Sequence, residues 1–110
     1  MSSYVLENQR NKIEASIDLR EIDGRWYYKM WFRTPESSMS TTMPAKGKGY
    51  VHRAVALNEA LQDLDKSTTT LSETQRQVLK LWFKQANRQA WEGISVDMRV
   101  SMYQDELNAR

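Results

Sequence analysis

The dipeptide Asp23-Gly24 lies between two stretches in which apolar and polar residues alternate, and it constrains the fold more than any other feature. Asp-Gly is the favoured pair for a two-residue type I′ turn, because both central residues of that turn need a positive φ. We therefore predict a β-hairpin over residues 12–34. Counting outward from the turn pairs Leu19 with Tyr28 and sets the register of the whole hairpin.

The predicted register sorts the side chains of the hairpin into two faces. The apolar face consists of Ala15, Ile17, Leu19, Trp26, Tyr28, Met30 and Phe32. On the opposite face Glu14 meets Arg33, and Asp18 meets Lys29. Each cross-strand charge pair contributes only about 0.2–1 kcal/mol, but a shift by one residue would move every side chain to the wrong face. The apolar face then needs a cover.

Three helices are predicted after the hairpin, over residues 50–65, 72–91 and 95–109, because apolar residues recur there at helical spacing. Ser72 precedes the second helix and Gln75 follows three residues later, which is a capping box. The helices supply the only apolar surface that can cover the sheet.

The third helix has its own start signal and its own stripe. Ser95 is a typical N-cap residue. Val96, Val100, Tyr103 and Leu107 recur every three or four residues, so we expect them to form one buried face. The predicted fold is a single α+β domain spanning residues 1–110, in which three helices cover an antiparallel hairpin or three-stranded sheet.

Two segments allow more than one interpretation. Residues 38–43 are rich in Ser, Thr and Met, and they fit either a third, edge strand that ends before Pro44 or a mobile loop. Residues 1–11 fit a short strand, a helical turn or an arm.

Composition argues against several classes of chemistry. The chain has no cysteine and a single histidine, His52, so the usual zinc sites cannot be assembled from it. It contains no phosphate-loop or dinucleotide-binding motif, and no pair of carboxylates is marked out as an acid and a base. We expect a binding module rather than an enzyme, without metal or cofactor.

Nothing in the sequence points to a membrane. No apolar run approaches the roughly 18 residues of a spanning helix, and the N-terminus lacks the apolar block of a signal peptide. A cytoplasmic location is the expectation.

The second predicted helix carries the clearest charge pattern. No acidic residue occurs from Thr74 to Trp91, while four basic residues, hereafter the basic ridge, recur every four positions: Arg76, Lys80, Lys84 and Arg88. Like charges at this spacing repel one another. A nucleic-acid backbone would compensate that repulsion. Solvation would also suffice, as would internal acidic partners such as Glu59, Asp63, Asp65, Asp105 and Glu106.

A second basic feature is the loop with the sequence KGKG. Lys46 and Lys48 precede the first predicted helix, and the backbone N–H groups at a helix start favour an anion. The alternative is a flexible, solvated loop.

The charged face of the hairpin also holds two aromatic residues, Tyr27 and Trp31, among basic neighbours. Aromatic side chains in such a setting can stack on nucleic-acid bases. They can equally pack beneath a loop, or form a protein contact.

The order of strand, Asp-Gly turn, aromatic strand, basic loop and helix is similar to that of small DNA-binding modules such as the arm-binding domains of tyrosine recombinases. The similarity covers about half of the chain, rests on element order alone, and implies DNA binding. The basic ridge, which is the least ordinary pattern in the sequence, makes nucleic-acid binding the first hypothesis. The second is a protein-interaction module, a homodimer or a small inhibitor, anchored by Trp31 and Trp91. The third is a small-ligand-binding protein or a carboxylate-based enzyme.

Overall fold

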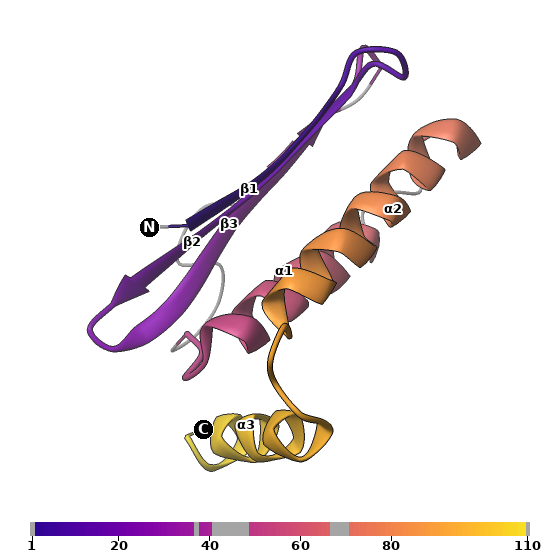
Figure 1. The fold of residues 1–110 in the computed structure, drawn as a ribbon. Coiled ribbons are helices and arrows are strands. Elements are labelled where there is room, and N and C mark those ends of the chain that lie inside the picture. Colours follow the sequence, from indigo (N-terminus) through magenta and orange to yellow (C-terminus); the bar gives the residue numbers. More distant parts are fainter. Residues whose placement is uncertain (1, 37, 41–48, 67–70, 110) are drawn as a thin grey trace.

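The computed structural model describes residues 2–36, 38–40, 49–66 and 71–109, and shows strands followed by helices (Figure 1). The predicted α+β class is confirmed. The strands are β1 (Ser2–Asn8), β2 (Ile13–Ile22), β3 (Arg25–Arg33) and β4 (Ser38–Ser40). The helices are α1 (Arg53–Lys66), α2 (Glu73–Ala90) and α3 (Val96–Asn108).

The β2–β3 hairpin has the predicted register, from Glu14 opposite Arg33 to Ile22 opposite Arg25. Its turn residue Asp23 has a φ of 52°. The following Gly24 has a φ of 79°, so both residues meet the requirement of a type I′ turn.

The sheet is antiparallel and four-stranded, in the order β1-β2-β3-β4. The segment left undecided at the N-terminus is β1, which pairs with β2 from Ser2 opposite Leu19 to Asn8 opposite Ile13. The edge strand β4 covers the first half of the segment 38–43 and pairs with the end of β3. The remainder of that segment lies outside the described residues.

A single bridge continues the β4 edge of the sheet beyond the undescribed segment. The backbone N–H of Trp26 donates to the carbonyl oxygen of Tyr50 at 2.7 Å, and the N–H of Tyr50 donates back at 2.8 Å. The ring of Tyr50 also stacks on Tyr28, with 6.3 Å between the ring centroids. The chain is therefore fastened to β3 just before α1 begins.

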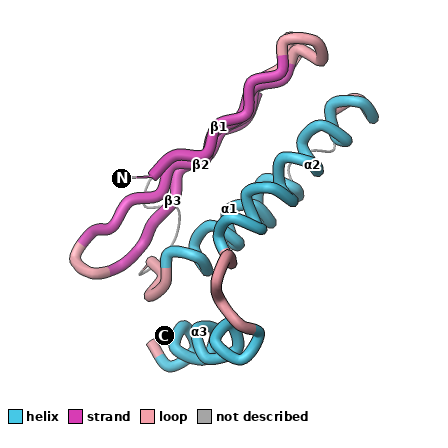
Figure 2. The backbone as a smooth tube through the Cα atoms, viewed as in Figure 1, coloured by secondary structure: helices cyan, strands magenta, loops and turns pink. Residues whose placement is uncertain are grey.

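The core lies between one face of the sheet and the helices α1 and α2, which run side by side along it (Figure 2). The predicted apolar face of the hairpin is buried there, apart from the half-buried Trp26. The largest fully buried side chains are Phe32, Ile13, Ile17, Leu19, Leu57, Leu64, Leu79 and Val55. Both start signals are confirmed, because Ser72 forms a capping box with Gln75 and Ser95 caps α3.

The predicted buried stripe of α3 is wrong. Val96, Val100 and Leu107 are 72%, 54% and 62% exposed, and only Tyr103 of the four packs partly against the core. Figure 1 shows why, since α3 lies beyond the end of the α1–α2 layer at which α1 begins. The sheet is already covered by two helices, and α3 turns a different side toward them.

In the part of the chain that the structure describes, no helix is long and apolar enough to cross a membrane.

Candidate nucleic-acid interface

The basic ridge follows from the way α2 is built. The capping box at Ser72 sets the start of the helix, and Leu79, Trp82, Ala86 and Ala90 turn toward the core. A spacing of four residues exceeds one helical turn, so each step along the ridge rotates by about 40°. Arg76 is consequently half-buried near the core, whereas Lys80, Lys84 and Arg88 are exposed.

The three exposed members of the ridge have no acidic partner among the residues that the structure describes. Within the described ranges, Lys80, Lys84 and Arg88 make no ion pair. Arg76 differs from them, since it already has an interaction partner in the chain. The compensation expected from acidic side chains is therefore not found for these three cations.

Three of the acidic residues considered as partners for the ridge are engaged elsewhere. Asp63 accepts a hydrogen bond from the hydroxyl of Tyr28. Asp105 and Glu106 both contact the start of α1.

A groove lies between the C-terminal part of α2 and the start of α3. Its lining residues are Lys84, Asn87, Arg88, Gln89, Trp91, Glu92 and Arg99. Three of these side chains carry a positive charge and one carries a negative charge. The groove extends the basic surface of the ridge onto α3, which sequence periodicity did not predict.

Trp91 forms the inner wall of this groove rather than an exposed anchor. It is 6% exposed and stacks on Tyr103, with 6.2 Å between the ring centroids. Its indole N–H donates to Oδ1 of Asn87 at 3.0 Å. The guanidinium of Arg99 lies over its ring, 5.1 Å from the centroid. Trp91 therefore serves as a fixed platform inside the molecule.

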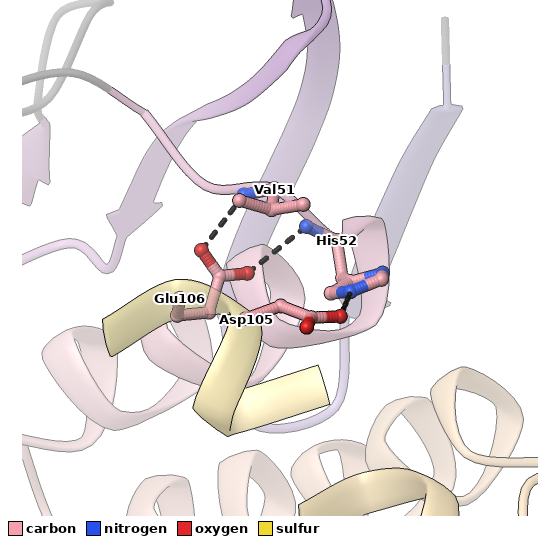
Figure 3. A network of polar contacts seen from close by, with 4 residues as sticks. All are labelled: Val51, His52, Asp105 and Glu106. Carbon is pink, nitrogen blue, oxygen red and sulfur yellow. Dashed lines mark hydrogen bonds and ion pairs between the residues drawn. The ribbon is translucent and has the colours of Figure 1, made fainter. Parts of the chain in front are cut away.

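The start of α1, predicted as an anion site, is filled by the chain's own carboxylate (Figure 3). Glu106 accepts hydrogen bonds from the backbone N–H of Val51 at 2.7 Å and of His52 at 2.9 Å. Nε2 of His52 lies 2.8 Å from Oδ2 of Asp105. Because the positive end of a helix dipole stabilises a negative charge, these contacts hold α3 against α1 and place a carboxylate where an external phosphate would bind.

Of the KGKG loop, the structure describes only Gly49. Lys46 and Lys48 lie outside the described residues. The following Gly49 has a φ of 75°, and a Cβ atom there would come within 2.8 Å of the ring of Tyr27. Tyr27 therefore packs beneath the backbone of Gly49, which matches the interpretation of this aromatic as covered by a loop.

Trp31 has a more open position on the outer face of the sheet. It is half-buried, lies opposite Ser16 of β2 and Ser40 of β4, and has the guanidinium of Arg33 5.6 Å from its ring centroid. Arg33 in turn pairs with Glu14. The contact between Trp31 and Arg33 leaves the aromatic ring partly accessible, but the ion pair with Glu14 offsets the charge of Arg33 and weakens its attraction for nucleic acid.

Two tyrosine hydroxyls are used for packing. Burial and the hydrogen bond to Asp63 raise the pKa of Tyr28 well above its ordinary value. Burial also raises the pKa of Tyr103, whose hydroxyl accepts a hydrogen bond from Asn58 that acts in the opposite direction. Both groups remain neutral near pH 7 and carry no charge to a ligand.

The pocket at the β1–β2 turn and the acidic residues of the described chain offer little to the small-ligand hypothesis. A pocket at the β1–β2 turn is lined by charged and polar side chains, among them Glu7, Lys12, Glu14 and Arg33, rather than by aromatic ones. No three His, Asp or Glu residues of the described chain are placed to hold a metal ion.

Comparisons with protein-family models, with curated proteins and with solved structures gave no match.

Sequence reasoning missed Arg99 and the role of Glu106. Arg99 stands alone among the neutral and acidic residues of α3, and it reaches the groove of Lys84 and Arg88 only because its guanidinium lies over Trp91 at the end of α2. Glu106 could have been found from the pairing of an acidic residue with a helix start that has no acidic residue in its own first turn.

Proposed function

We propose that this protein binds nucleic acid through α2 and makes its main contacts with the phosphate backbone. The observation that carries the proposal is the exposed row of Lys80, Lys84 and Arg88, none of which is paired within the described chain. Three like charges held on one helix face repel one another. Binding of a polyanion removes that repulsion, and the release of its counterions increases the entropy.

The proposal predicts binding with little sequence preference. The ridge consists of Lys and Arg side chains on the outside of a helix, and such contacts fix position on the backbone without reading bases. Binding should weaken steeply between about 50 and 200 mM salt. Fluorescence anisotropy with labelled duplex and single-stranded DNA and RNA measures this directly, and a lack of affinity at low salt for all of them would refute the proposal.

A charge-matched pair of variants tests the surface. The first replaces the ridge residues Lys80, Lys84 and Arg88 with Gln. The second variant also uses Gln, and it removes the same net charge at three exposed basic residues elsewhere: Arg10, Lys29 and Lys66. Loss of three phosphate contacts should lower the slope of log K against log salt by about 2.7, at about 0.9 per contact. If both variants lose the same amount of affinity and of salt slope, the attraction depends on net charge alone, and an α2 interface is contradicted.

A protein-interaction module is the second candidate, and the exposed stripe of α3 favours it. Val96, Val100 and Leu107 are spaced by four and seven residues and therefore share one side of the helix. Apolar residues gathered in this way mark protein contacts more often than scattered ones do. Trp31 on the sheet is half-buried and offers a further contact point, whereas Trp91 is buried.

Light scattering separates the two forms of a protein-interaction module, which are a homodimer and a small inhibitor of another protein. A homodimer through α3 should dissociate when Val100 and Leu107 are both replaced by Lys, because the charges would be buried without partners. If the wild-type chain is a monomer at high concentration, the homodimer is excluded.

A further inference from the structure

The groove between α2 and α3 contains an arginine with an incomplete hydrogen-bond shell. Among the side-chain atoms of the described residues, Nε of Arg99 is the one that is buried without a hydrogen-bond partner. No hydrogen bond or ion pair engages the rest of its guanidinium within that part of the chain. The guanidinium therefore donates none of its N–H groups to the described chain, although buried polar groups are nearly always satisfied.

The packing around Arg99 holds its guanidinium in place. The group lies over the ring of Trp91, which is itself fixed by the hydrogen bond to Asn87 and by the stack on Tyr103. Burial of Nε leaves the two terminal nitrogens as the part of the fork that an acceptor can reach. An arginine stacked on an aromatic ring loses less conformational freedom on binding, and its planar fork matches the oxygens of a phosphate.

The charges of the groove favour an anion. Lys84 and Arg88 line it from α2 and Arg99 lines it from α3, against the single carboxylate of Glu92. The first two belong to the basic ridge, so the groove is continuous with the surface that is proposed to bind nucleic acid.

We propose that this groove is a specific phosphate-binding site, in which one phosphodiester group of the bound strand lies between Lys84, Arg88 and Arg99. The inference rests on the proposed function and adds a contact from α3 to it. Two non-bridging oxygens can accept from the fork of Arg99, while Lys84 and Arg88 supply point charges on the other side. The negative charge of Glu92 repels the phosphate and weakens its binding.

Two single substitutions should act in opposite directions. Arg99→Gln removes one phosphate contact, so it should weaken binding of a DNA duplex about fivefold to tenfold at 0.1 M salt and reduce the salt slope by about 0.9. Glu92→Gln removes the repelling charge and should strengthen binding about twofold to fivefold under the same conditions. Arg10→Gln, at an exposed position on the β1–β2 turn, is the control and should change little.

A conservative variant separates charge from packing. Arg99→Lys keeps the charge but loses the stack on Trp91, so it should retain the salt slope of the wild type while binding more weakly. If Arg99→Lys loses the slope as fully as Arg99→Gln does, the effect comes from disturbed packing and the phosphate contact is wrong.

Nuclear magnetic resonance of the unmodified protein supplies a test that needs no variant. Addition of the same duplex should shift the Nε–H signal of Arg99 and the indole N–H signal of Trp91, but not the indole signal of Trp31 on the outer sheet face. If backbone signals of α2 shift while those of Arg99 and Trp91 stay fixed, the groove is excluded and the α2 proposal survives. If the protein binds no nucleic acid at all, both proposals fail.

Discussion

Two regions of this molecule are held together by different physics. The sheet and the helices α1 and α2 share a filled apolar core, in which Ile17, Leu57 and Leu64 are fully buried. Helix α3 buries one charged residue, Glu106, and leaves Val96 and Leu107 in solvent. The first region follows the rule that apolar stripes turn inward, and the second departs from it.

The difference shows what an apolar stripe can and cannot predict. A stripe predicts burial when the chain offers an uncovered apolar surface, and α1 and α2 already take up the sheet. The start of α1, by contrast, offers unpaired N–H groups and no acidic residue of its own. Glu106 satisfies those donors, and together with the stack of Tyr103 on Trp91 it places the polar side of α3 toward the domain.

The largest expected effect on the free energy of unfolding comes from a leucine-to-alanine substitution, which is made once in each region. Leu57→Ala should lower the free energy of unfolding by about 2–5 kcal/mol, because it opens a cavity in the core. Leu107→Ala should change it by less than about 0.5 kcal/mol, because that side chain is 62% exposed. Urea denaturation followed by circular dichroism measures both. A comparable loss for Leu107→Ala would mean that the stripe of α3 is covered in solution.

Much of the first region could be predicted from the sequence, because its signals are local. The Asp23-Gly24 turn determines the register, and the capping residue Ser72 marks the start of α2. The strand β1 remained one of three alternatives, because Tyr4 and Leu6 are spaced for a strand but are too few to separate it from other short structures. The position of α3 depends on a contact between residues 52 and 106, and no local pattern reports such a distant pairing.

The candidate site was predicted only in its helical part. Lys80, Lys84 and Arg88 lie on one helix, so their spacing alone places them together. Arg99 joins them through tertiary packing, and Trp91 proved to be the buried platform beneath it. Residues on a single element can be grouped from sequence, whereas residues that meet between elements cannot.

The next effect tests the contact that holds α3. Glu106→Gln should cost about 1–3 kcal/mol, because the amide can accept from one N–H but turns a donor toward the other. Hydrogen exchange should accelerate at Val51 and His52 and throughout α3, while the β2–β3 hairpin stays protected. Asp105→Asn, at an exposed position of the same helix, is the matched control and should cost less. Unchanged exchange in Glu106→Gln would show that the apolar contacts of Met102 and Tyr103 suffice to hold α3.

A smaller effect compares the tyrosine hydroxyls of the two regions. Tyr28→Phe should cost about 0.5–1.5 kcal/mol near pH 7, because Asp63 loses a hydrogen bond. The pKa of Tyr28 is raised in the folded state, so the unfolded chain releases this proton first and stability falls as pH rises above about 10.

The slope for one such group is about 1.4 kcal/mol per pH unit. Tyr28→Phe should remove this slope. The free energy of unfolding of both proteins, measured at pH values above about 10, checks this. Tyr103→Phe, in the half-buried contact of α3, should remove less of the slope, since Asn58 partly offsets the rise in its pKa. If both variants keep the full slope, other groups cause it.

The smallest expected effect on stability concerns an exposed carboxylate, in contrast to the buried Glu106. Glu14 pairs with Arg33 across β2 and β3, and their side chains are 44% and 65% exposed. A double-mutant cycle with Glu14→Gln and Arg33→Gln should give a coupling of about 0.2–1 kcal/mol. It should vanish at 1 M salt, where the Debye length falls to about 3 Å. A coupling above about 2 kcal/mol that survives salt would mean that the outer face of the sheet is shielded from water in solution. Trp31 would then be buried against a partner, and the protein-interaction candidate would gain over nucleic-acid binding.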